Sequence, residues 1–515
     1  MNVPDEQGSK ETLALSHWVM MGCWILIIFS IGNKPVHLDE ANFLAMTQGD
    51  FWKPHLIQIN WEGVEQSAFD VLSNPPGMVW LLWPVKNLSI GWMRLWILPW
   101  SFLAIWGMWR CTEYSSGSKQ NLWLMLCSPI FVLSHNSLMP EMPLLACILV
   151  GWQGILWGQR SFLWALLLGC AALFRYSGLT MIPLLMAWVW FRKPTEGWKL
   201  LLAVCLPTIL LYVHDMWVYG QWHFWHMLSF QQEQQSWSAI VHKLCALSSM
   251  LVLGGGILPN FRRRSGFVWG GLSLCVLMTG LLSASLTLEM SILAWFSVPL
   301  GFFCIGSFIY DSVKSRQFWL MCWLVGGFAF LLGLRFAATR YWLPFIVPYW
   351  LLMHSDKSKR YWVAIMGVIS MHLAWDDAKL AQSQHNLAKQ TVALCQTQYG
   401  ERTGYFAGHW GWQYVLERHD WLPVEDDEKI PNSVCFSFSK SSWPQEVVND
   451  CFDSTVKLQA NYKNIGLPLR VHTIDGLANY HSYMISNRPP ISTITPFGWG
   501  YDDWDQVELR RSCRR

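Results

Sequence analysis

Long apolar segments separated by short polar connections fill the first 375 residues of the chain. A helix that crosses the hydrocarbon core of a bilayer needs about 20 predominantly apolar residues. Segments near this length predict transmembrane helices at 15–32, 94–112, 120–137, 141–158, 161–176, 178–191, 199–218, 244–259, 266–285, 289–310, 317–335, 341–354 and 360–375. The segments at 161–176 and 178–191 are short enough to form one broken helix, so we expect about 11–13 transmembrane helices.

The pattern changes at residue 376, where polar and charged residues replace the long apolar runs. We predict a helix over 376–398, strands at Thr403–Phe406 and Ser433–Ser437, and a second helix that starts within Gln413–Glu417. The chain is therefore predicted to have a polytopic α-helical membrane module over residues 1–375 and a small soluble α/β domain over residues 376–515, which is near the usual domain size.

Two connections in the first part are too long to be simple loops, at 33–93 and 219–243. The first contains an apolar stretch at 75–85 that is too short to span a membrane. It starts at Pro75-Pro76, which suits a helix N-terminus. We expect a helix here that lies in the membrane interface.

The composition agrees with a membrane protein, because 53% of the residues are hydrophobic and only 14% are charged. Soluble domains average about 25% charged residues. The net charge of +3 also excludes a surface that tracks nucleic-acid phosphates. No cleavable signal peptide is evident, so the first segment is expected to remain as an anchor. The bias of Lys and Arg in short loops places the N-terminus in the cytoplasm and everything after residue 375 outside it.

Four of the 14 cysteines lie in the late, polar part of the chain. These are Cys395, Cys435, Cys451 and Cys513. If this part is extracytoplasmic, one disulfide among them is compatible with an oxidising compartment. The spacing leaves the pairing open.

Acidic residues at the predicted outer face are the first candidates for chemistry. Asp39 and Glu40 follow the first apolar segment by a few residues, and Glu141 stands in a tight outer loop between two segments. Acids in such places are costly and tend to be functional. The alternative is that all three are helix-capping or first-turn acids, which the helix dipole favours.

Arginines at the same face are the second group. Arg175, Arg335 and Arg340 each fall at the predicted outer end of an apolar segment. The guanidinium has a fixed fork of donors that suits phosphate. The alternative is that each side chain snorkels to lipid headgroups.

Together these residues fit transfer from a lipid-phosphate donor to a hydroxyl or amine acceptor. One carboxylate would remove the acceptor proton as general base, and arginines would stabilise the negative charge on the leaving phosphate. A transporter or flippase of lipid-linked sugars and a non-catalytic membrane scaffold are the alternatives. The sequence shows no inverted repeat of the kind common in transporters.

The order of motifs resembles the GT-C glycosyltransferases, in particular the protein O-mannosyltransferases and the lipid A aminoarabinose transferases. The resemblance rests on the Asp-Glu motif in 37–43, the Pro-Pro segment in 74–80, the acidic motif in 139–143 and the Arg-Tyr-x-Leu-Pro motif in 340–348. The segment at 408–414 is similar to a strand-to-helix turn in the periplasmic domain of some bacterial members.

This resemblance implies an inverting transfer from a polyprenyl-phosphate sugar donor to a protein, lipid or glycan acceptor at the periplasmic face of a bacterial inner membrane. It implies Asp39 as catalytic base, with Glu40 beside it and Glu141 as a second active-site acid. The motif at 340–348 adds Tyr341 to Arg175, Arg335 and Arg340 as the candidate donor-phosphate site.

The sequence also departs from the family. Asn42 and Asn74 stand where aminoarabinose transferases usually carry an Arg and a Lys. These losses shift phosphate binding to the three arginines. Some members bind a divalent metal ion, for which Glu141, His223 and His226 are the candidate ligands here.

Overall fold

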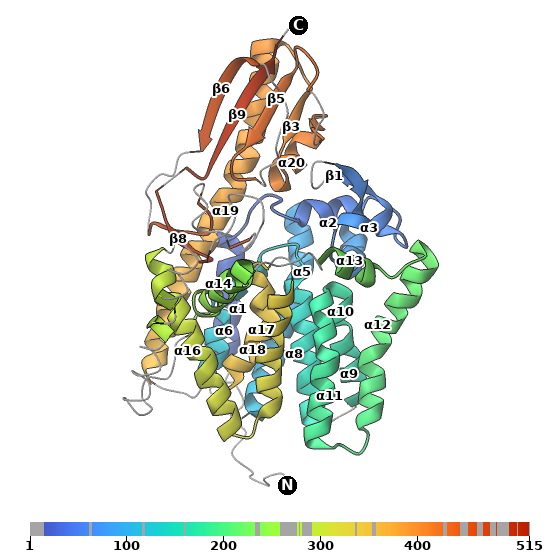
Figure 1. The fold of residues 1–515 in the computed structure, drawn as a ribbon, viewed down its shortest axis with the longest axis vertical. Helices are drawn as coiled ribbons and strands as arrows, with labels where there is room; N and C mark the ends of the chain where they lie inside the picture. Colours follow the sequence, from blue (N-terminus) through green and yellow to red (C-terminus); the bar gives the residue numbers. More distant parts are fainter. Residues whose placement is uncertain are drawn as a thin grey trace.

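A computed structural model of the chain describes residues 15–513. The structure leaves out residues 61–63, 116–118, 159–160, 232–236, 258–274, 278, 281–290, 335–336, 353–356, 426–429, 443–451, 461–466, 474–479, 482–493 and 502. A bundle of helices forms one end of the molecule and a β-sheet domain forms the other (Figure 1). The long helix α19 (Lys357–Tyr399) runs through both ends.

The bundle is built from helices of unequal length. Its helices are α1 (Leu15–Ile31), α5 (Ile90–Tyr114), α6 (Lys119–Leu126), α7 (Pro129–His135), α8 (Glu141–Trp157), α9 (Ser161–Gly169), α10 (Ala171–Phe174), η3 (Tyr176–Thr180), α11 (Met181–Arg192), α12 (Gly197–Tyr219), α13 (His223–Gln231), α14 (Trp237–Leu253), α16 (Ile292–Lys314), α17 (Phe318–Gly333), η4 (Thr339–Trp342) and α18 (Leu343–Leu352).

Each predicted apolar segment holds a helix, apart from 266–285, which lies largely outside the described residues. Two predicted single helices are broken. The segment 120–137 divides into α6 and α7 at Ser128-Pro129, where the Ser128 hydroxyl accepts the backbone N–H of Phe131 and starts a new helix. The segment 161–176 ends at Phe174, because Arg175 adopts an extended conformation.

Two of the described helices, α12 and α16, are long and apolar enough to cross a membrane. Shorter apolar helices lie at Leu15–Ile31, Glu141–Trp157, Ser161–Phe174, Ile240–Leu253 and Phe318–Gly333. Large apolar side chains on α12 point away from the protein, with Leu210 60% and Trp217 80% exposed. Water-soluble surfaces rarely carry contiguous apolar patches of this kind.

The first long connection folds over the end of the bundle that faces the sheet domain (Figure 1). It contains α2 (Glu40–Met46), η1 (Pro54–Leu56), the antiparallel strands β1 (Gln58–Asn60) and β2 (Glu65–Ser67), α3 (Ala68–Val71), α4 (Gly77–Leu82) and η2 (Trp83–Val85). The predicted helix after Pro75-Pro76 is α4 with η2. A Cβ on Gly77 would lie 2.2 Å from the carbonyl oxygen of Leu173, so this glycine lets α4 pack directly on α10.

The C-terminal domain has one five-stranded mixed sheet in the order β4-β3-β5-β9-β6. Strands β3 (Gly404–Ala407), β4 (Leu422–Pro423) and β5 (Cys435–Ser439) are parallel, whereas β9 (Asp505–Ser512) runs antiparallel to β5 and to β6 (Phe452–Ala460). The short strands β7 (Leu469–Arg470) and β8 (Gly498–Trp499) form a separate pair. Helix α20 (Trp410–Glu417) follows β3. The predicted strands thus correspond to β3 and β5. The predicted second helix corresponds to α20, but its predicted start within Gln413–Glu417 is wrong, because α20 begins at Trp410 and ends at Glu417.

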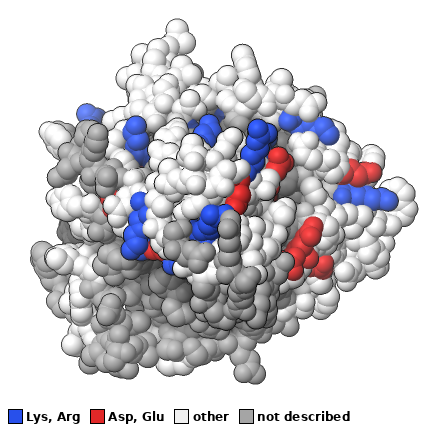
Figure 2. Space-filling model, turned by 90° about the horizontal axis from the view of Figure 1, so that it is seen from above, with Lys and Arg blue, Asp and Glu red and all other residues white. Residues whose placement is uncertain are grey.

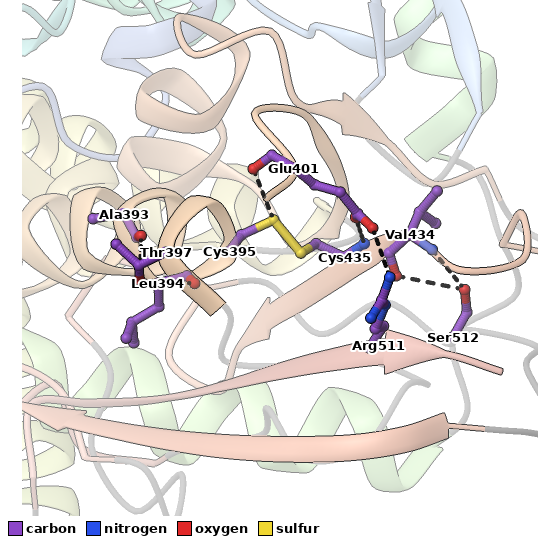
Figure 3. Close-up of a disulfide and its surroundings, with 9 residues drawn as sticks. All are labelled: Ala393, Leu394, Cys395, Thr397, Glu401, Val434, Cys435, Arg511 and Ser512. Carbon is purple, nitrogen blue, oxygen red and sulfur yellow. Dashed lines mark hydrogen bonds and ion pairs between the residues drawn. A yellow bond between two sulfur atoms is a disulfide. The ribbon is translucent and has the colours of Figure 1, made fainter. Parts of the chain in front are cut away.

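One disulfide joins the end of α19 to the sheet (Figure 3). It links Cys395 to Cys435, and Glu401 beside it accepts the backbone N–H of Cys435 and pairs with Arg511. Cys513 is also disulfide-bonded, so this part of the chain holds more than the single bridge expected from the sequence. Cys451 lies outside the described residues.

Helix α19 connects the two ends without a break. Its first half packs on α1, α6 and α7, and its second half packs on the sheet, where Leu387 and Ala388 join Phe406 in the domain core. The predicted division at residues 375 and 376 stays a prediction and falls inside this helix.

Viewed from the sheet end, basic and acidic side chains are interspersed, in keeping with the small net charge (Figure 2).

Candidate active site

Asp39 lies at the start of α2, on the side of the bundle that faces the sheet domain. It is the N-cap residue, but its side chain makes no capping hydrogen bond. Its Oδ2 instead accepts a hydrogen bond of 2.7 Å from Nη2 of Arg340, in η4. The Asp39 side chain is 21% exposed, so one side of the carboxylate remains accessible. The capping alternative therefore does not describe what this carboxylate contacts.

Glu141 is the first residue of α8 and contacts the same arginine. Its Oε1 lies 3.3 Å from Nε of Arg340 and pairs with Nη1 of Arg175. The Glu141 side chain is 1% exposed. Within the described residues its second oxygen, Oε2, has no hydrogen-bond partner. Arg340 thus bridges two carboxylates that lie far apart in the sequence.

The aromatic ring of Tyr341 supports the two arginines. The guanidinium of Arg175 lies 3.5 Å from the centre of this ring, and that of Arg340 lies 5.6 Å from it. Such contacts stabilise a cation electrostatically. Burial acts to lower the pKa of Arg340, but neighbouring Asp39 and Glu141 raise it above its ordinary value. The site therefore contains two fixed positive charges.

Glu40 is adjacent to Asp39 in sequence but has different partners. Its Oε2 accepts from Arg94 at 2.8 Å and from the backbone N–H of His37 at 3.0 Å. Its Oε1 accepts from the backbone N–H of Leu138 at 2.8 Å. With a side-chain exposure of 1%, this carboxylate ties the start of the first long connection to the loop before α8.

The C-terminal part of the chain also reaches this site. Nη1 of Arg340 donates to the backbone carbonyl of His481 at 3.3 Å, and the His481 ring contacts Asp377 in α19. A small cavity beside these groups is lined in part by Lys34, Glu141, Arg340 and His481.

The histidines proposed as metal ligands lie in α13 and contact other groups. Nδ1 of His223 lies 2.7 Å from the hydroxyl of Tyr176, and Nε2 of His226 lies 3.1 Å from Asp70. Glu141 contacts the two arginines instead. Among the described residues, the three-residue groups with metal-ligating atoms close together include neither histidine.

The structure therefore brings Asp39, Glu141, Arg175, Arg340 and Tyr341 together, whereas Arg335 lies outside the described residues. Sequence reasoning missed Arg94, Asp377 and His481, which contact this group or its neighbours. The available signal for Asp377 was a pair of acids at the end of an apolar segment, Asp376-Asp377.

Comparisons with known proteins find no family model that matches the chain and no matching curated protein. Solved structures do match. ArnT from Cupriavidus metallidurans bound to undecaprenyl phosphate has a TM-score of 0.44 and 14% identity, over 83% of this chain and 94% of ArnT. The archaeal oligosaccharyltransferase AglB from Archaeoglobus fulgidus, in complex with an inhibitory peptide and a dolichol-phosphate, has a TM-score of 0.44 and 11% identity, over 80% of this chain and 64% of AglB.

ArnT, a lipid A aminoarabinose transferase, and AglB are both GT-C glycosyltransferases. The chain is thus similar to solved structures of two GT-C glycosyltransferases, the superfamily that its motifs resemble.

Proposed function

We propose that the chain is a membrane glycosyltransferase that moves a sugar from a polyprenyl-phosphate donor to an acceptor at the outer face of the membrane. The observation that carries the proposal is the position of Arg340, which contacts the carboxylates of both Asp39 and Glu141. These acids come from separate loops at the same end of the bundle. The site thus combines an accessible carboxylate with fixed positive charge, as transfer from a sugar phosphate requires.

In the proposed reaction, Asp39 accepts the proton of the acceptor hydroxyl or amine as that group attacks the anomeric carbon. The bond from this carbon to the phosphate oxygen breaks, and the polyprenyl phosphate leaves with its negative charge. Arg340 and Arg175 stabilise that charge, so the phosphate needs no proton. Attack opposite to the leaving group inverts the anomeric centre.

The other residues hold these groups in place. Glu141 orients Arg175 and Arg340 through the contacts of its Oε1, and Tyr341 supports both guanidinium groups. Glu40 acts as a positioning residue, because its oxygens are already occupied by Arg94 and two backbone N–H groups. The role of Arg335 as a further phosphate ligand stays a prediction.

The proposed location is a bacterial inner membrane, with the site and the C-terminal domain on the periplasmic side. Two observations support it. Exposed apolar side chains on α12 and α16 fit contact with lipid. The Cys395–Cys435 disulfide fits an oxidising compartment, and it lies in the domain that contacts the site.

The proposal is tested in proteoliposomes that contain the purified chain, a polyprenyl-phosphate sugar labelled in the sugar, and an extract of envelope lipids, glycans and proteins. We expect label to move to an acceptor as free polyprenyl phosphate is formed in equal amount. Movement of intact donor across the bilayer would instead identify a transporter. Intact donor that neither moves nor reacts across a panel of sugars would indicate a scaffold.

A further inference from the structure

A cluster of buried polar side chains beside the site has no role in the proposed transfer. Asp377 of α19 lies between His37, from the segment before α2, and His481, from the C-terminal part of the chain. The three side chains come from distant segments and are at most 8% exposed. Such burial of three ionisable groups requires partners that satisfy them.

The atoms of this cluster converge on one point. Oδ1 of Asp377 lies 2.5 Å from Nε2 of His481 and 3.5 Å from Nε2 of His37. One ligand atom from each residue lies within 4.8 Å of the other two. The second oxygen of Asp377 pairs with the ammonium of Lys34. One carboxylate oxygen of Asp377 therefore faces the two histidines, and the other is bound by Lys34.

His37 provides a second, independent observation. It is 1% exposed; its Nδ1 has no hydrogen-bond partner among the described residues, and its Nε2 has only the long 3.5 Å contact with Oδ1 of Asp377. An imidazole buried in this way is costly unless another group binds it. Its Nε2 faces the oxygen of Asp377, so the unsatisfied atom is directed into the cluster.

We propose that His37, Asp377 and His481 bind one divalent transition-metal ion, with Zn²⁺ the best match. Two imidazoles and one carboxylate are a ligand set that Zn²⁺ takes in sites with an open fourth position. Ca²⁺ and Mg²⁺ prefer all-oxygen sites. The ion takes the place of the hydrogen bond between Asp377 and His481, with small shifts of the two rings. Lys34 supplies the outer hydrogen bond that ligating carboxylates usually receive.

The location gives this ion a positioning role. His37 is two residues from Asp39, and the carbonyl of His481 accepts from Arg340. A small cavity lined in part by His37, His481, Glu141 and Arg340 lies beside this cluster. The ion therefore links the segment that leads to Asp39, the helix α19 and the segment that holds Arg340. This role rests on the proposed function, whereas metal binding itself does not.

Metal binding is measured on the full chain in detergent. The protein is stripped with a chelator and titrated with Co²⁺, which is followed by its visible absorption, and then with Zn²⁺ in competition. We expect one ion per chain. His37→Gln leaves the contacts of Asp377 with Lys34 and His481 in place and should weaken binding at least about 100-fold. His226→Gln is the matched control, since it removes a histidine from the other candidate group.

Several outcomes overturn the proposal. They are a wild-type chain that binds no ion, a folded His37→Gln chain that binds like wild type, or a loss of binding in His226→Gln. If His37→Gln does not fold, the proposed site is tested by anomalous scattering at the zinc edge from crystals of the wild-type protein. A peak between His37 and His481 supports the site, and its absence after soaking in Zn²⁺ refutes it. Glycosyl transfer is not used as a readout, so failure of the proposed function leaves this test intact.

Discussion

Asp39 and Glu40 are adjacent acids for which the structure predicts opposite consequences of losing the charge. In Asp39→Asn the amide oxygen can still accept from Nη2 of Arg340, and the side chain is already 21% exposed. The hydrogen bond is kept and only the negative charge is lost, so we expect the free energy of unfolding to fall by about 1–2 kcal/mol. The amide cannot accept the acceptor proton, so transfer should slow by about 10²–10⁴-fold, which is about 3–5 kcal/mol in activation free energy.

Glu40→Gln is the matched neighbour and should behave in the reverse way. A glutamine amide nitrogen cannot accept from Arg94 or from the backbone N–H groups that the carboxylate now satisfies. Breaking a buried pair that is 1% exposed on both sides costs about 3–5 kcal/mol of stability. The loss of activity should then follow the loss of folded protein.

The assay compares initial rates of sugar transfer with thermal unfolding midpoints, both in the same detergent. Rates are normalised to the folded fraction from size-exclusion chromatography. The reasoning is refuted if folded Asp39→Asn keeps more than about a tenth of the wild-type rate. It is also refuted if Glu40→Gln is as stable as wild type and as inactive as Asp39→Asn.

Three further predictions follow from other contacts. Arg340→Lys keeps the positive charge but loses the forked guanidinium that contacts both carboxylates. We expect kcat/KM for the polyprenyl-phosphate donor to fall by about 10²–10³-fold in steady-state kinetics. A kcat/KM equal to that of wild type would contradict the proposed contact of Arg340 with the phosphate. Replacing Cys395 and Cys435 together by Ser opens a bridge between residues 40 apart and should cost about 4 kcal/mol of stability, seen as a lower unfolding midpoint that reductant also produces in wild type; equal midpoints contradict this. Burial lowers the pKa of His409 from 6.5 to about 4, so the unfolded chain takes up a proton at this histidine before the folded chain does. The free energy of unfolding, measured with denaturant, should therefore be unaffected by His409 above pH 6.5 and fall by up to about 3 kcal/mol as the pH drops to 4. In His409→Gln this fall with pH should be smaller, and an unchanged pH dependence contradicts the assignment.

The sequence was sufficient to predict the groups that meet at the ends of helices. Asp39, Glu141 and Arg340 each follow or precede an apolar segment, and alternation of the chain across a membrane places such positions on one side. Their contacts with one another are seen only in the structure. The strands β3 and β5 were also readable, because short apolar runs in a polar region have few alternatives.

Pairings between distant segments could not be read in the same way. No motif in the sequence links Arg94 to Glu40, and only the packing of α5 beside the first connection shows that the two side chains pair. Asp377 directly follows a predicted membrane segment, and only the structure shows that it is buried within α19 against Lys34 and His481. The local sequence pattern predicts which residues are buried in helices and strands, but it does not predict which distant polar group pairs with a buried charge.

The contact of Arg340 with the carbonyl of His481 has a consequence for engineering the chain. A chimera that exchanges everything after residue 400 for the equivalent part of a relative keeps every acid and arginine of the site, yet it replaces one of the acceptors that fixes Arg340. Grafts of this kind should recover turnover only when the backbone around position 481 is transplanted in register with η4.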